Sequence, residues 1–288
     1  MTEFWIILTG ILVVASTGTL GCFLVLRKMT MVGDAISHAV LPGIVIAYLI
    51  SGERNSFVMI IGAALIGLLT TFLIEFLHKK GNVQEDASIG ITFTSFFALG
   101  VILISYFAGN VDLDQDCVLY GEIAYITLDP MLINGIEYGP RAVWLLTIVL
   151  LVVITVVLIG FRSLKVTTFD PSYARSIGIS ATFWHYILMS MVSLSTVASF
   201  ESVGAILVVA FLTVPPATAY LLTENLTRMI LLSILFGVLA SISGYYLAEL
   251  SNGSIAGAMA TAGGVIFAVV FIAKKLHVLY YKKNIQTV

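Results

Sequence analysis

The amino-acid sequence predicts an all-α polytopic membrane protein of about nine transmembrane helices. Of the 288 residues, 59% are hydrophobic and only 10% are charged, and the mean hydropathy is +1.07. A soluble domain of this length needs far more charged surface to stay in solution. Apolar runs of roughly 20 residues, the length that crosses a bilayer, recur along the chain. The positive charges fall alternately on the two sides of these runs.

Nine segments are expected to span the membrane. They are 4–26, 31–50, 57–77, 88–107, 143–161, 182–198, 203–222, 229–250 and 254–273. Lys and Arg predict the orientation, because cytoplasmic loops carry an excess of these residues. Of the 14 Lys and Arg residues, all but Arg54 and Arg141 fall in the loops of one side. The sequence therefore predicts an external N-terminus and a cytoplasmic C-terminus.

The span 31–50 carries an unusual group of polar residues. Asp34 and His38 are four residues apart, so that their side chains lie on one face of a helix. Pro42 has no N–H group and leaves the carbonyl of His38 without its helical partner. Polar groups inside a membrane usually serve function, and a carboxylate with an imidazole suits a divalent first-row metal ion. The alternative is an internal Asp–His hydrogen bond that holds two helices together.

The span 203–222 contains a second expected helix break, at Pro215 and Pro216. The two prolines free the backbone carbonyls four residues before them, and broken helices of this kind line cavities in transporters. At about 1.5 Å per residue, Pro42 and Pro215 both fall near the middle of the bilayer. The coincidence predicts a shared central cavity. The alternative is that prolines are simply common in membrane helices.

Two ligands do not complete a metal site, so further ligands are needed. Glu201 is the favoured candidate, since it lies in the outer turn that leads into the proline-containing span. An ordinary acid at the membrane interface is the alternative. Glu75 is expected to form a helical ion pair with Lys79, four residues later. His185 is expected to be a hydrogen-bonded histidine at the inner surface.

The inner loop 162–181 encodes a short helix at the cytoplasmic surface. Asp170 is a good N-cap residue, Pro171 suits the first helical position and Gly178 is placed as a stop. Docking to a cytoplasmic partner explains such a helix, and simple packing on the surface is the alternative. The outer loop 108–142 is rich in acids, which predicts either a vestibule that concentrates cations or a plain solvated loop.

Four stretches carry a longer pattern along the chain. They read LRKMTMVGDAISHAVLPGIVIAYLI, FDPSYARSIGI, ESVGAILVVAFLTVPPATAYLL and GYYLAELSNGSIAGAMATAGG. In these four stretches the sequence resembles the metal-ion ABC transporter permeases, which are the bacterial importers of manganese, zinc and iron. The resemblance implies a single transmembrane permease domain over residues 1–288, in the bacterial plasma membrane. It implies that Asp34 and His38 handle the metal. It also implies a coupling helix near 170–178, with Ala174 and Gly178 as its small residues.

The same resemblance implies the partners. They are two cytoplasmic ATP-binding cassette subunits, an external metal-binding protein and a second permease subunit, which is either the same chain or a sibling. No nucleic acid partner and no permanently bound cofactor are expected, since the metal is the cargo. ATP hydrolysis is expected on the separate subunits, because this chain lacks the Gly-Lys dipeptide of a P-loop.

The cargo and the mechanism leave alternatives open. The stretch DQDCVLYGEI is similar to the manganese and iron branch of the family, which favours manganese, with zinc and iron as alternatives. A proton-coupled secondary carrier would need a buried titratable relay, whereas the remaining acids lie at the interfaces. An intramembrane metalloenzyme built on Asp34 and His38 would need further His or Cys ligands in the spans.

Overall fold

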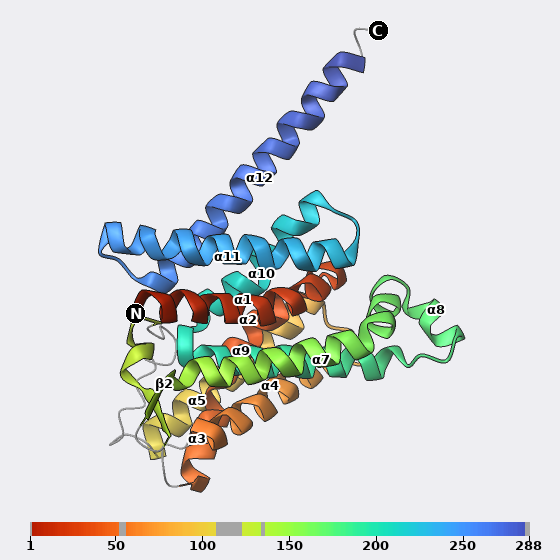
Figure 1. The fold of residues 1–288 in the computed structure, drawn as a ribbon. Helices are drawn as coiled ribbons and strands as arrows, with labels where there is room; N and C mark the ends of the chain where they lie inside the picture. Colours follow the sequence, from red (N-terminus) through yellow and green to blue (C-terminus); the bar gives the residue numbers. More distant parts are fainter. Residues whose placement is uncertain (1, 52–55, 108–122, 134–135, 286–288) are drawn as a thin grey trace.

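The computed structural model describes residues 2–51, 56–107, 123–133 and 136–285 (Figure 1). Within these residues, nine helical segments are long and apolar enough to cross a membrane, as predicted. The helices are α1 (Thr2–Arg27), α2 (Met31–Ala39), α3 (Leu41–Ser51), α4 (Ser56–Lys79), α5 (Glu85–Phe107), α7 (Arg141–Phe169), α8 (Pro171–Ser176), α9 (Ala181–Val203), α10 (Ala205–Leu222), α11 (Leu226–Ser251) and α12 (Ile255–Ile285). The segments α2 and α3 together form one span.

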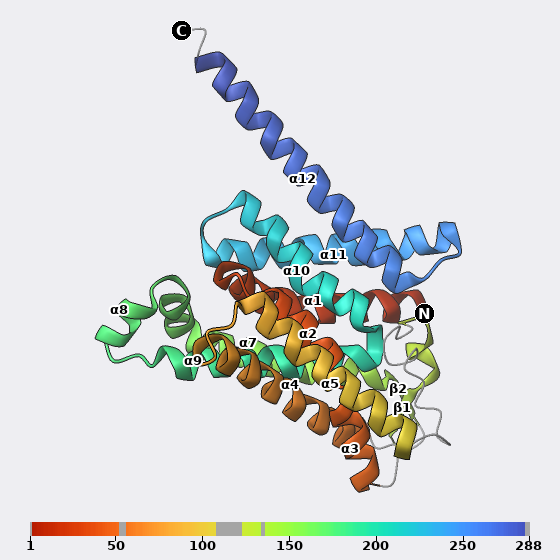
Figure 2. The ribbon, with the colours of Figure 1, turned by 180° about the vertical axis from the view of Figure 1, so that it is seen from behind.

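Helix α1 lies at the centre of the bundle. It packs against α7 and α9 on one side and against α10 and α11 on the other, and residues 16–24 in its second half are all buried. Helices α2 to α5 pack against one another as a second group, which meets α9 through α2 and α4 (Figures 1 and 2). We call the end of the bundle where α8 projects the α8 end. The opposite end, which holds the N-terminus, is the hairpin end.

Helix α10 crosses Pro215 and Pro216 without ending, so the expected break at these prolines is not an interruption of the helix. Its consequence appears in the packing instead. Pro216 leaves the carbonyl of Leu212 without a helical donor, and α1 approaches this carbonyl at Gly21. A Cβ atom on Gly21 would lie 2.0 Å from the Leu212 oxygen and 2.8 Å from Pro216 Cγ. The contact therefore requires glycine, and it fixes the position of α10 along the axis of α1.

The span that contains the Asp–His pair is divided into two short helices. Helix α2 ends at Ala39, α3 begins at Leu41, and Pro42 is the second residue of α3. The backbone stays compact across Val40, whose N–H bonds to Ile36 and whose carbonyl accepts from the N–H of Ile44. The first half of the span packs against α4, α5, α9 and α10, whereas the second half packs against α4 and α5.

Helix α7 is longer than the sequence predicted. The expected loop 162–181 begins only after Phe169, since residues 162–169 continue the helix. The segment contains neither Gly nor Pro, and Pro171 is the first residue that resists a continuous helix. A helix of 29 residues is about 44 Å long. It therefore extends well beyond a hydrocarbon core of about 30 Å and carries α8 away from the bundle.

The outer loop also contains structure that was not predicted. Its described part forms a 3-10 helix, η1 (Ile123–Leu128), and an antiparallel hairpin of β1 (Pro130–Ile133) and β2 (Ile136–Pro140). The 3-10 helix lies against α1, α9 and α12. Four acids of the predicted vestibule, Asp112, Asp114, Asp116 and Glu122, lie outside the described residues.

Candidate functional site

The structure brings Asp34 and His38 together on the exposed side of α2. His38 Nε2 lies 3.6 Å from Asp34 Oδ1, and the two side chains are 36% and 40% exposed, respectively. The imidazole faces α5, where its ring lies 5.9 Å from the ring of Phe93 and 6.4 Å from that of Phe97, measured between centroids. The pair is therefore held by an apolar wall on one side and remains accessible on the other.

The arrangement suits a cation better than a purely structural hydrogen bond. A separation of 3.6 Å is longer than a good hydrogen bond, and neither group is sealed in a packing contact. A carboxylate oxygen and an imidazole nitrogen are ligands that divalent first-row metal ions accept. These two groups supply part of a coordination shell, so that the remaining ligands have to come from backbone carbonyls, water or another chain.

Glu201 is not brought to this pair. It is exposed in the last turn of α9, at the hairpin end. Across the part of the chain that the structure describes, no three His, Cys, Asp or Glu side chains gather closely enough to hold a metal ion. The expectation that Glu201 completes a site within one chain is therefore not met, because its helix carries it to the far end of the bundle.

Helix α8 forms as its cap residues predict. Asp170 Oδ1 accepts hydrogen bonds from the N–H groups of Ser172 (3.0 Å) and Tyr173 (2.9 Å), and Pro171 occupies the first turn. The helix ends before Gly178, whose φ of +80° favours glycine. Ala174 is fully buried beneath the helix, where a larger side chain would push α8 outward.

Three exposed apolar side chains lie in and beside α8. Tyr173 is 56% exposed and Ile177 is 48% exposed, and Phe169 at the end of α7 is equally open. These three side chains, together with Arg162 and Lys165, line a cavity of about 660 Å³ between α7 and α8. Exposed aromatic and aliphatic side chains around a hollow are typical of a surface that binds another protein.

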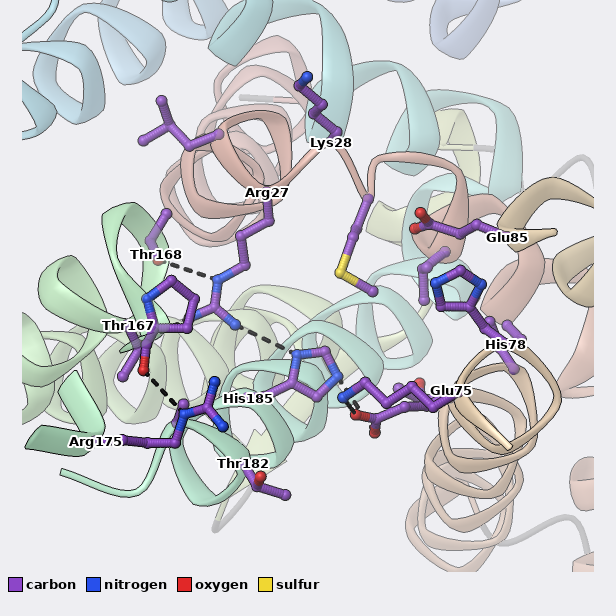
Figure 3. A pocket seen from close by; sticks show the side chains of 18 residues that line it. Arg27, Lys28, Glu75, His78, Glu85, Thr167, Thr168, Arg175, Thr182 and His185 are labelled. Carbon is purple, nitrogen blue, oxygen red and sulfur yellow. Dashed lines mark hydrogen bonds and ion pairs between the residues drawn. The ribbon is translucent and has the colours of Figure 1, made fainter. Parts of the chain in front are cut away.

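A larger polar pocket of about 700 Å³ lies at the α8 end (Figure 3). Among its lining residues are Arg27, Lys28, Glu75, Lys79, Arg175 and His185. Glu75 forms the predicted ion pair with Lys79. Glu75 Oε2 also lies 3.6 Å from His185 Nε2, a contact that was not predicted, and the side chains are only 10% and 14% exposed. Both residues lie four positions from a helix end, at equal depth in the bundle, but no local sequence pattern pairs them.

Comparison with known proteins places the chain in a family. The sequence profile of the ABC 3 transport family matches residues 2–275. The chain belongs to this family. Its resemblance to the metal-ion ABC transporter permeases is thereby confirmed, and it is a multi-pass protein of the bacterial inner membrane.

Relatives of this permease match it along nearly its full length. It is 49% identical to the manganese transport system membrane protein MntD of Bacillus subtilis, over 98% of both chains. It is 44% identical to the zinc transport system membrane protein TroD of Treponema pallidum, over 94% of this chain and 74% of the relative. The solved structure of PsaBC from Streptococcus pneumoniae in complex with Fab superposes with a TM-score of 0.77 at 34% identity, over 93% and 90% of the two chains.

The N-cap of α8 in this permease can be tested directly. Replacement of Asp170 by Ala removes the acceptor for two N–H groups, which costs about 1 kcal/mol of helix stability. We expect amide hydrogen exchange in residues 172–176 to become about fivefold faster. Asp170→Asn keeps an acceptor oxygen and is expected to stay near the wild-type rate. Equal exchange in Asp170→Ala and wild type would show that packing of Ala174 alone holds the helix.

Proposed function

We propose that this permease is the membrane subunit of an ATP-driven importer of divalent transition metal ions, with manganese as the cargo. The observation that carries the proposal is the half-exposed Asp34–His38 pair on a divided span of an ABC 3 family chain. Manganese accepts carboxylate and carbonyl oxygens together with an imidazole, whereas zinc sites favour more nitrogen or sulfur. The manganese system named for the relative at 49% identity supports the same cargo.

ATP hydrolysis is proposed to take place on separate cytoplasmic subunits that dock on α8. The Gly-Lys dipeptide of a P-loop is absent from the chain, so the energy has to enter through a partner. The basic residues Arg27, Lys28, Lys79 and Arg175 line the pocket at the α8 end, which supports a cytoplasmic position for this end by the positive-inside rule. The exposed side chains of Phe169, Tyr173 and Ile177 in and beside α8 are then proposed to face the ATPase.

The remaining partners lie on the opposite side and within the membrane. An external metal-binding protein is proposed to deliver the ion at the hairpin end. A second permease subunit is proposed to supply ligands that complete the Asp34–His38 pair. Within the described residues this chain offers no third acid, histidine or cysteine at the pair, and an ion held by few ligands on each side is bound weakly enough to leave again.

Metal uptake by bacteria that express the permease with its ATPase and binding protein tests the proposed function. We expect ATP-dependent manganese accumulation that excess manganese suppresses more strongly than equal concentrations of zinc or iron. Stronger suppression by zinc would show that zinc is the cargo, and the proposed ATP-driven mechanism would still hold. Uptake into ATP-free vesicles driven by a pH gradient would instead show a proton-coupled carrier and contradict the proposal.

Docking of the ATPase on α8 gives a separate prediction. Tyr173→Ala removes the large exposed side chain of α8. Truncation of a tyrosine that is buried at the centre of a protein–protein interface typically costs about 2 kcal/mol of binding free energy. We expect the dissociation constant of the ATPase subunit to rise by at least about tenfold. The matched control is Tyr125→Ala, which removes an equally exposed tyrosine from η1 at the hairpin end. Equal losses in both variants would place docking elsewhere.

A further inference from the structure

The polar pocket contains an arginine whose guanidinium joins three helices. Arg27 is the last residue of α1. Its Nε donates to Thr168 Oγ1 at 3.0 Å and its Nη2 donates to Thr167 Oγ1 at 3.1 Å, in the last turn of α7. Its Nη1 lies 3.4 Å from His185 Nδ1 on α9, as Figure 3 shows. The forked side chain thus connects the central helix to the end of α7 and the beginning of α9.

The contact with Arg27 sets the proton position on His185. A guanidinium can only donate hydrogen bonds, so Nδ1 of the imidazole has to be the acceptor. The ring proton of neutral His185 then sits on Nε2, which faces Glu75 Oε2 at 3.6 Å. These two atoms are buried and have no other hydrogen-bond partner within the described part of the chain. The N–H of His185 is thus directed from the Arg27 side toward the Glu75 carboxylate. At 3.6 Å this contact is electrostatic rather than a good hydrogen bond, and it relates α9 to α4.

The same proton position argues against a second metal site at Glu75 and His185. A histidine ligand binds metal through a nitrogen without a proton and donates its other N–H to an acceptor. Here the other nitrogen meets a positively charged donor, and Lys79 lies on the Glu75 carboxylate. The two cations disfavour a divalent ion at this place. The group is built to hold helices in register rather than to bind a cation.

The connected helices lie between α8 and the metal-handling pair. Thr167 and Thr168 directly precede Phe169 and Asp170, and Asp170 caps α8. On the side away from α8, α4 and α9 both pack against α2, which carries Asp34 and His38. A movement of α8 reaches α2 through this polar group and through the apolar packing around it.

We propose that Arg27 is a positioning residue that couples the movement of α8 to α4 and α9, and thereby couples ATP hydrolysis to metal transport. The inference rests on the proposed function of the permease. Lysine cannot replace the fork, because an ammonium is a point charge and cannot reach both threonines and the imidazole in one plane. Arg27 acts on the junction between α7 and α8 through its hydrogen bonds to the hydroxyls of Thr167 and Thr168.

The test uses the purified complex of permease and ATPase subunits in proteoliposomes, supplied with the external metal-binding protein loaded with manganese. Manganese transport and ATP hydrolysis are measured in the same vesicles. For Arg27→Ala we expect ATP hydrolysis within twofold of wild type and about tenfold less manganese moved per ATP hydrolysed, and for Arg27→Lys an intermediate loss. Arg228→Ala, which removes an exposed arginine at the start of α11, is the control and is expected to keep the wild-type ratio.

A second set of variants keeps the inference testable if Arg27→Ala does not fold. Thr167→Val with Thr168→Val removes the acceptors and leaves Arg27 in place, and we expect a similar loss of manganese per ATP. In that background Arg27→Lys should add little further loss, because coupled residues are not additive. An unchanged ratio in the folded variants, or a parallel fall of transport and hydrolysis, would overturn the coupling role alone. A wild-type complex that hydrolyses ATP but moves no manganese would overturn the proposed function together with it.

Discussion

Removal of either member of the metal-handling pair is expected to lower manganese uptake by about 100-fold. Loss of a group that orients a metal ligand typically costs 10- to 100-fold in affinity or activity, so loss of a ligand itself is expected at the upper end. Among the described residues no third acid, histidine or cysteine lies beside this pair. We expect Asp34→Ala and His38→Ala to behave alike, because the carboxylate and the imidazole are proposed to bind the same ion. The measurement is the initial rate of manganese uptake at matched expression in the membrane.

Assembly separates this effect from misfolding. Both side chains are more than one-third exposed, so their truncation leaves no large cavity and no buried unpaired group. The variants are expected to co-purify with the ATPase subunit in wild-type amounts. Asp34→Asn keeps the shape of the side chain and removes the charge, and it is expected to fail like Asp34→Ala. Wild-type uptake in His38→Ala would remove the pair from the transport route.

Gly21→Ala is expected to destabilise the bundle by about 3 kcal/mol or more. Its methyl group would lie 2.0 Å from the Leu212 carbonyl oxygen, and this obstacle is backbone that cannot change rotamer. Insertion of a methyl group into a packed core typically costs 1–3 kcal/mol, and more where the backbone has to move. The measurement is the thermal stability of the detergent-purified permease, together with the amount of protein in the membrane.

The chain offers a matched control for this substitution. Gly264 lies in the first third of α12, and a Cβ atom there would meet no neighbouring atom within 4 Å. Gly264→Ala is expected to be neutral or to stabilise the helix by up to about 1 kcal/mol, because alanine has the higher helix propensity. If both substitutions lower the thermal stability equally, loss of glycine in a membrane helix is responsible, and the contact with Leu212 is not.

The spans and the short helix were predictable because their signals are local. Apolar length predicted the nine spans, and the Asp170 and Gly178 caps predicted α8. The end of α7 was misplaced because the charged residues Arg162 and Lys165 suggested a loop, whereas helix propensity continues to Phe169. The hairpin β1–β2 was missed because four- and five-residue strands carry too short a pattern to read against a background of turns.

Within the candidate site, too, the local features were predictable from the sequence and the contacts between distant helices were not. Asp34 and His38 were found because four residues of one helix place them together. Glu75 and His185 are 110 positions apart in the sequence, and only the packing of α4 against α9 brings them within 3.6 Å. The approach of Gly21 to Leu212 depends in turn on the height of α10 against α1. Such relations between distant helices have no local sequence signal.

The division of the second span has a consequence for the metal ligands. Since α2 stops at Ala39 and α3 starts anew at Leu41, the Asp–His pair sits on a rod of only nine residues with a joint at its end. Pro42 removes one backbone hydrogen bond across that joint, so fewer backbone bonds join α2 to α3 than join two turns of an unbroken helix. Because Asp34 and His38 both lie on α2, any displacement of this short helix would carry the two side chains together and leave the distance between them unchanged.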